Sequence, residues 1–124
     1  MLSPATSETM GRLLRGVVER GTGYRAALDG YTVGGKTGTS DKFLVEEGQY
    51  SDEVSIASFI GLAPVEDPRV VVAVVLDSPR GELEDGTELK FGGASAAPVF
   101  AAITEATLHQ LGVSPTAEEG VGDG

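Results

Sequence analysis

The sequence has 124 residues and no cysteine, which is the length of one domain and excludes disulfides, thiolate chemistry and cysteine-based metal sites. Acidic residues outnumber basic ones 19 to 9, and the net charge of -10 argues against nucleic acid and against a polybasic contact with a membrane as binding modes. His109 is the only histidine, so histidine-rich metal sites and histidine-dependent catalytic triads are not expected.

An amphipathic helix is predicted near the N-terminus, over about residues 4–20. Ser3 is a residue type that caps helices, and Pro4 is tolerated at the first helical position. Gly21 is a residue type that ends them. The apolar stripe of this helix consists of Met10, Leu13, Leu14, Val17 and Val18.

Three strands are predicted in the middle of the chain, at about residues 31–43, 54–63 and 69–77. The second strand alternates with period two, and a turn over residues 64–68 joins it to the third, so these two should form an antiparallel hairpin. The third is a nearly continuous run of β-branched residues, which predicts a central, buried strand. An acidic loop is predicted over residues 44–53.

A second helix is predicted over about residues 95–111, where apolar residues recur at helical spacing before Gly112. The small and acidic residues 114–124 are expected to form a disordered tail. The order of helix, strand, hairpin and helix predicts an α+β fold, with both helices on one face of an antiparallel sheet. Burial is expected between the final helix and the hairpin strands.

The most informative motif is Gly35-Lys36-Thr37-Gly38-Thr39. Together with Gly30 it fits the phosphate-loop pattern Gly-x-x-x-x-Gly-Lys-Thr letter for letter. A phosphate loop needs a buried strand before it and a helix directly after it. Residues 25–29 are a poor buried strand, and residues 38–41 do not begin an apolar-striped helix, which disfavours a nucleotide-binding protein.

Two other interpretations place the motif on a strand. The first is a strand that lines an active site. Alternation puts Thr37 and Thr39 on one face, where paired hydroxyls can bind a carboxylate. Lys36 lies on the other face and can supply positive potential beside a serine nucleophile, while backbone N–H groups can help to hold an oxyanion. The simpler alternative is a glycine-rich hairpin strand with a solvated lysine.

An ordered series of motifs favours the first of these interpretations. Lys36-Thr37-Gly38-Thr39 resembles the third signature box of serine penicillin-binding proteins and the related β-lactamases. The flanks resemble the class B transpeptidases of cell division and elongation over about residues 3–113. The matching segments are Gly16-Val17-Val18, Gly21-Thr22-Gly23, Gly30-Tyr31-x-Val33, residues 58–64, residues 70–77 and Gly92-Gly93-x-x-Ala96-Ala97-Pro98-Val99-Phe100.

The resemblance implies that residues 1–113 are the C-terminal portion of a peptidoglycan D,D-transpeptidase domain, with no metal or other cofactor. Such an enzyme attacks the D-Ala-D-Ala stem peptide with a serine, and β-lactams acylate the same serine.

Lys36 would supply positive charge beside the serine. Thr37 and Thr39 would bind the terminal carboxylate, Gly38 would allow close approach, and the Thr39 backbone N–H would contribute to the oxyanion site. Asp41, Lys42 and Phe43 would shape the rim. The implied partners are the stem peptide, β-lactams and cell-division or elongation proteins.

The family's two other boxes, Ser-x-x-Lys and Ser-x-Asn, are missing from the sequence. It contains no asparagine, and no lysine lies three residues after a serine. The family pattern places both boxes upstream of residue 1, so the chain alone is expected to be inactive. The parent protein is expected to be anchored in the cytoplasmic membrane with this domain outside it, and its targeting signal is expected to lie outside this chain. A non-catalytic remnant or binding module of a cell-wall complex is the alternative.

Overall fold

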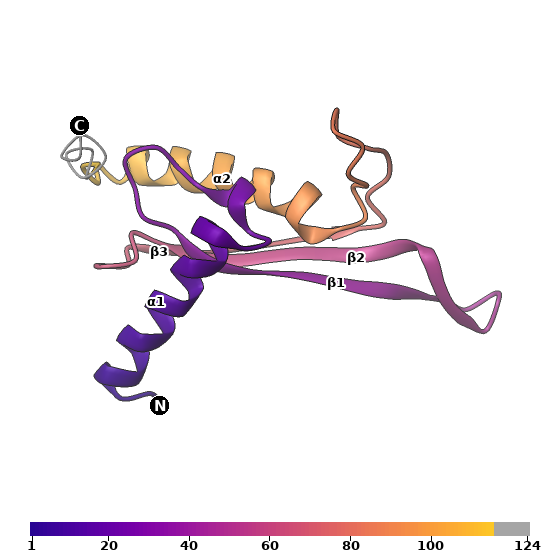
Figure 1. Cartoon of the computed structure of the whole chain (residues 1–124), viewed down its shortest axis with the longest axis horizontal. Coiled ribbons are helices and arrows are strands. Elements are labelled where there is room, and N and C mark those ends of the chain that lie inside the picture. The colour runs from indigo at the N-terminus through magenta and orange to yellow at the C-terminus, as the bar shows by residue number, and fades with distance from the viewer. Residues whose placement is uncertain (116–124) are drawn as a thin grey trace.

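The structure is a computed structural model that describes residues 1–115, so most of the predicted acidic tail lies outside the described residues. Helix α1 (Pro4–Arg20) leads through the short 3-10 helix η1 (Tyr24–Ala26) into a sheet, and helix α2 (Gly92–Gln110) follows it. The sheet contains β1 (Gly34–Leu44), β2 (Gln49–Ala63) and β3 (Val70–Asp77), antiparallel and in the order β1-β2-β3. The predicted α+β class is confirmed (Figure 1).

Helix α1 has the predicted ends. The Ser3 side chain accepts a hydrogen bond from the Thr6 N–H at 3.1 Å, and Pro4 opens the helix. At the other end the Gly21 N–H donates to the Val17 carbonyl at 3.0 Å. Capping of this kind satisfies backbone groups that have no partner inside the helix.

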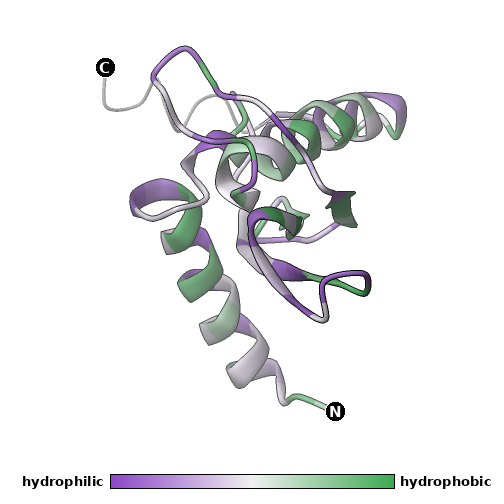
Figure 2. Cartoon of the chain, turned by 90° about the vertical axis from the view of Figure 1, so that its right-hand side faces the viewer, coloured by the Kyte–Doolittle hydropathy of each residue, from purple (hydrophilic) through white to green (hydrophobic). Residues whose placement is uncertain are grey.

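The prediction that both helices pack on one face of the sheet holds only for α2. Val18, near the end of α1, is buried in the core, but the rest of α1 extends away on the side opposite α2 (Figure 1). The helix passes close to the backbone at the start of β1. A Cβ atom added to Gly34 would lie only 3.2 Å from the Leu14 Cβ, so the glycine allows this approach. The apolar stripe of α1 appears green in Figure 2, and two of its five residues, Met10 and Leu13, stay 41% and 61% exposed.

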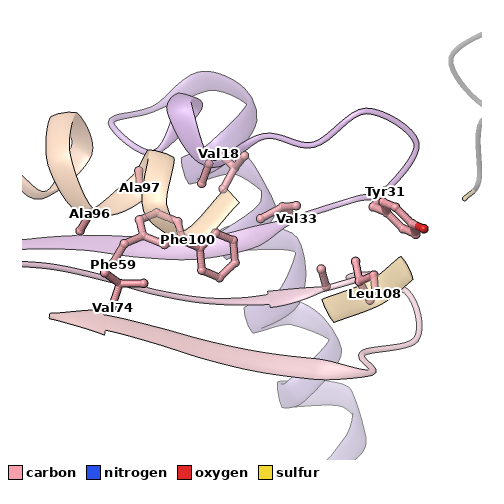
Figure 3. Close-up of a cluster of buried hydrophobic side chains, with 11 residues drawn as sticks. Val18, Tyr31, Val33, Phe59, Val74, Ala96, Ala97, Phe100 and Leu108 are labelled. Carbon is pink, nitrogen blue, oxygen red and sulfur yellow. The ribbon is translucent and has the colours of Figure 1, made fainter. Parts of the chain in front are cut away.

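The core lies between α2 and the β2–β3 hairpin, as predicted. Phe59 of β2 and Phe100 of α2 are fully buried, and their ring centroids are 4.7 Å apart (Figure 3). Ala96 and Ala97, also fully buried, keep this part of α2 thin enough to lie close to the sheet. A Cβ atom on Gly61 would come within 2.8 Å of the Phe100 Cζ, so this glycine makes room for the ring.

The prediction that the third strand is central and buried is wrong. Within residues 1–115, β3 pairs only with β2 and forms an edge of the sheet. Val74 faces α2 and is 7% exposed, whereas Val71 and Val75 point to the other face and are 71% and 64% exposed. The apolar run supplies two apolar faces, but α2 covers only one of them.

The predicted acidic loop is also mostly wrong, because β2 begins at Gln49 and not near residue 54. Residues 49 and 50 pair with the end of β1, where Tyr50 stands opposite Phe43 with ring centroids 5.1 Å apart. An aromatic pair of this kind stabilises a two-stranded hairpin despite the acidic residues nearby. Only residues 45–48 form the turn.

Candidate substrate-binding strand

The Lys36–Thr39 motif lies on β1, at an edge of the sheet. These residues pair with Ala57–Ile60 of β2, and within residues 1–115 no strand pairs with the other side of β1. The strand interpretation of the motif is therefore consistent with the structure. The residues after Lys36 remain extended as far as Leu44, so they do not provide the helix N-terminus on which a phosphate loop depends.

The side chains of Lys36 and Thr37 start from opposite faces of the sheet but meet at its edge. Thr37 is paired with Phe59, which is buried under α2, whereas Lys36 is paired with Ile60, which is exposed on the other face. The Lys36 ammonium nevertheless bends back. Its Nζ donates to the Thr37 carbonyl at 3.0 Å and lies 3.4 Å from the Thr37 Oγ1. The cation and the hydroxyl are thus adjacent despite the alternation of the strand.

Lys36 also carries a charge that no carboxylate neutralises within the described part of the chain, since none of the ion pairs there includes it. Its side chain is exposed at the strand edge. An exposed, unpaired ammonium creates positive potential for an incoming anion.

The hydroxyls of Thr37 and Thr39 are each held by a group from outside the sheet. The Thr37 Oγ1 is hydrogen-bonded to the Thr22 Oγ1 at 3.0 Å, and Thr22 lies in the loop between α1 and η1. The Thr39 Oγ1 accepts a hydrogen bond of 2.9 Å from the Gly92 N–H at the start of α2. Phe91, the N-cap residue of α2, provides no side-chain cap, so Thr39 supplies the missing acceptor from β1.

Two consecutive glycines allow the start of α2 to pack directly on the strand backbones. A Cβ atom on Gly92 would lie 2.4 Å from the Ser58 carbonyl oxygen and 2.5 Å from that of Gly38. One on Gly93 would lie 2.6 Å from the Thr22 carbonyl oxygen. Any larger residue would therefore push the end of α2 away from the hydroxyl of Thr39.

Gly38 lies between the two threonines on the face opposite α2. A Cβ atom at this position would come within 2.5 Å of the Ser58 Oγ, so the absence of a side chain makes room for a hydroxyl of β2. The predicted role of Gly38 in admitting a ligand remains a prediction, as do the catalytic and binding roles of Lys36, Thr37 and Thr39.

The distal part of β1 is tied to the end of β3. The Lys42 Nζ donates to the Asp77 Oδ1 at 2.6 Å and to the Ser78 Oγ at 3.1 Å. Hydrogen bonds from Lys42 and then Ser78 hold the pKa of Asp77 below its ordinary value. Of the residues predicted to shape the rim, Lys42 thus has a structural partner and Phe43 packs on Tyr50, while Asp41 lies where the register of the hairpin shifts.

Thr22 and Gly92 are the neighbours of the motif that sequence reasoning missed as site residues. Both lie in segments with paired or flanking glycines, Gly21-Thr22-Gly23 and Gly92-Gly93, which is a signal of close backbone approach. The sequence does not show which strand these segments approach, because Thr22 and Thr37 are 15 residues apart and Gly92 is 53 residues from Thr39.

Comparison with known proteins identifies a family. Residues 1–105 match the family model described as the penicillin binding protein transpeptidase domain. Stage V sporulation protein D of Bacillus subtilis (strain 168) is 44% identical over 115 residues, which are 93% of this chain and 17% of that protein.

Solved structures agree with this family in both sequence and fold. The transpeptidase domain of penicillin-binding protein 3 from Burkholderia pseudomallei, in its apo form, is 43% identical with a TM-score of 0.78, over 92% of this chain and 32% of that one. Penicillin-binding protein 3 from Mycobacterium tuberculosis, complexed with ampicillin, is 34% identical with a TM-score of 0.78, over 93% of this chain and 26% of that one. The chain therefore spans a third or less of each of these relatives.

Proposed function

Because the chain belongs to the penicillin-binding protein transpeptidase family, we propose that it forms the substrate-binding part of a peptidoglycan D,D-transpeptidase. The observation that carries this proposal is the grouping of the Lys36 ammonium with the hydroxyls of Thr37 and Thr39 along a sheet edge with which no strand of residues 1–115 pairs. In this proposal, the strand binds the C-terminal carboxylate of a D-Ala-D-Ala stem peptide.

The hydrogen-bonding state of the Thr39 hydroxyl suits this task. A threonine hydroxyl has one proton to donate and two lone pairs that accept. The Thr39 Oγ1 already accepts from the Gly92 N–H, so its own proton remains available for a carboxylate oxygen. A hydroxyl that accepts one hydrogen bond becomes a stronger donor in the next, and the exposed Lys36 adds the positive charge that makes a hydrogen bond to a carboxylate strong.

The acyl-transfer step needs groups that this sequence does not contain. It has no Ser-x-x-Lys box and no Ser-x-Asn box, so we assign the attacking serine and its activating lysine to the remainder of the transpeptidase domain. Within that domain, Lys36 would lie beside the serine and the Thr39 backbone N–H would help to stabilise the oxyanion. The acylating β-lactams would bind the same strand, and the ampicillin complex of the Mycobacterium tuberculosis relative supports this part of the proposal.

We further propose that the parent protein acts outside the cytoplasmic membrane, where peptidoglycan is cross-linked, together with cell-division or elongation proteins. Among residues 1–115, neither helix has the length and apolar character required to cross a bilayer.

A chimera tests the proposed function. Residues 1–113 would replace the matching segment in the transpeptidase domain of Burkholderia pseudomallei penicillin-binding protein 3, and acylation by a fluorescent penicillin would be measured. We expect the chimera to be labelled, Lys36→Met to reduce the acylation rate, and the isolated chain to show no covalent label. A folded chimera that is not labelled, or covalent labelling of the isolated chain, would contradict the proposal.

A further inference from the structure

Thr22 is fixed in space by the backbone around it. The N–H groups of Gly21 and Gly23 both donate to the Val17 carbonyl, at 3.0 and 3.1 Å, so the loop folds back onto the last turn of α1. Gly23 is buried, and a Cβ atom there would lie 3.1 Å from the Phe59 ring and 3.2 Å from the Val17 side chain. The residue between these glycines therefore has a defined position although it is itself exposed.

From this position Thr22 contacts both structures that support the motif. Its hydroxyl is hydrogen-bonded to the hydroxyl of Thr37 on β1. Its carbonyl oxygen lies against Gly93 in the first turn of α2, at a distance that leaves no space for a Cβ atom. Thr22 thus lies where the α1–η1 loop, β1 and α2 converge.

We propose that Thr22 is a positioning residue that holds the Thr37 hydroxyl in the orientation needed to recognise an anionic carboxylate. The inference rests on the proposed function, in which Thr37 contacts that carboxylate. A free threonine side chain divides its population between staggered rotamers. The bond to Thr22 favours one of them, which also keeps the Thr37 Oγ1 beside the Lys36 ammonium.

The inference predicts an effect on carboxylate recognition that general destabilisation would not produce. In the chimera, the second-order rate constant of acylation would be measured with benzylpenicillin and with its methyl ester, which lacks the negative charge. Thr22→Val keeps the shape of the side chain but removes the hydroxyl. We expect this variant to react about five- to tenfold more slowly with the acid, the loss of roughly one hydrogen bond, and at nearly the original rate with the ester.

Two further variants serve as controls. Thr22→Ser keeps the hydroxyl and should restore the acid rate constant to within about twofold of the parent chimera. Thr107→Val removes a hydroxyl on α2 whose hydrogen bond within residues 1–115 goes to the Ile103 carbonyl of its own helix, and it should leave both rate constants unchanged. Equal losses with acid and ester, or no loss with the acid in an active Thr22→Val chimera, would overturn the inference.

A second measurement separates this inference from the proposed function. NMR three-bond couplings report the Thr37 χ1 rotamer in the 124-residue chain itself, without any acylation. We expect a single rotamer in the parent chain and in Thr22→Ser, and averaged couplings in Thr22→Val. Unchanged couplings in Thr22→Val would refute the positioning role, whereas a chimera that fails to acylate would refute only the proposed function.

Discussion

Lys42 of β1 and Asp77, the last residue of β3, form an ion pair of 2.6 Å that spans β2 between them. Ser78 extends the contact, because its hydroxyl donates to the Asp77 Oδ1 at 2.9 Å and accepts from the Lys42 Nζ. Both outer strands of the sheet are thereby joined at the end where the β1–β2 hairpin projects (Figure 1).

This contact gives the folded chain a defined response to acid. The hydrogen bonds from Lys42 and Ser78 lower the pKa of Asp77 below the ordinary 3.8. A lowered carboxyl pKa stabilises the fold at pH values above the unfolded pKa, and that contribution is lost as the pH falls through the folded pKa. An NMR titration should therefore place the Asp77 midpoint below 3.8 and move it upward in Lys42→Gln.

Asp85 provides the internal control for this titration. Its pKa is also lowered, by hydrogen bonds from Thr87 and by the neighbouring Arg25, and none of these groups contacts Lys42. Its midpoint should stay where it is in the Lys42→Gln variant. A midpoint of Asp77 that does not respond to Lys42→Gln would show that the ion pair does not persist in solution.

The buried aromatic pair should dominate the stability of the chain. Phe100→Ala removes a fully buried ring from its contact with Phe59, which is expected to lower the free energy of unfolding by about 3–5 kcal/mol. Val99→Ala, at a neighbouring position that is 38% exposed, should have a much smaller effect. Urea denaturation followed by circular dichroism measures both, and similar losses would show that α2 does not dock as described.

The glycine at the start of α2 should be more sensitive than a glycine inside α1. Gly92→Ala places a methyl group against two carbonyl oxygens and should destabilise the chain by about 1–3 kcal/mol. It should also break the bond from the Gly92 N–H to Thr39, which is visible as faster hydrogen exchange of that amide.

Gly11→Ala is the matched control for this change. A Cβ atom on Gly11 would lie 3.4 Å from the Val65 Cγ1, an ordinary contact, and alanine is the better helix former by about 0.5–1 kcal/mol. We therefore expect the Gly11 variant to be as stable as the parent or more stable. If both variants lost the same stability, close approach at Gly92 would not be the cause.

The sequence predicted the elements whose signals are local. The cap at Ser3, the helix that the apolar stripe predicts over about residues 4–20 and the strand that the period-two alternation around Phe59 predicts each depend on neighbouring residues, and the structure confirms all three. The second strand was predicted to begin too late, near residue 54, because acidic residues suggested a loop, whereas the cross-strand contact of Phe43 with Tyr50 extends its pairing with β1.

The surroundings of the motif could not be predicted in the same way. That Thr22 and Gly92 approach β1 depends on where α1 ends and where α2 begins in space, and no periodicity contains this information. The apolar run of β3 shows that both of its faces are suited to burial, but it does not show which partner covers each face.

A buried hydroxyl on α2 offers a stabilising substitution. Thr104 is fully buried, and its Oγ1 has no hydrogen-bond partner within the described residues. A buried polar group without a partner costs about 1–3 kcal/mol, so Thr104→Val should raise the free energy of unfolding by about 1 kcal/mol. Thr107→Val is the control, because its exposed hydroxyl is bonded to Ile103. A loss of stability in Thr104→Val would reveal a partner for the hydroxyl in solution.

The sheet face opposite α2 should make the isolated chain associate with itself. Ile60, Val71 and Val75 are 52%, 71% and 64% exposed there, and β3 presents an unpaired edge within the described residues. Exposed apolar edge strands pair readily with other chains. Sedimentation of the isolated chain should therefore show concentration-dependent oligomers, and the double variant Val71→Lys and Val75→Lys should be monomeric with an unchanged circular dichroism spectrum. Val74→Lys, at a position buried under α2, should instead unfold the chain. If the unsubstituted chain were a stable monomer, this expectation would be contradicted. That result would favour the alternative in which the chain is an independent binding module and not one part of a larger catalytic domain.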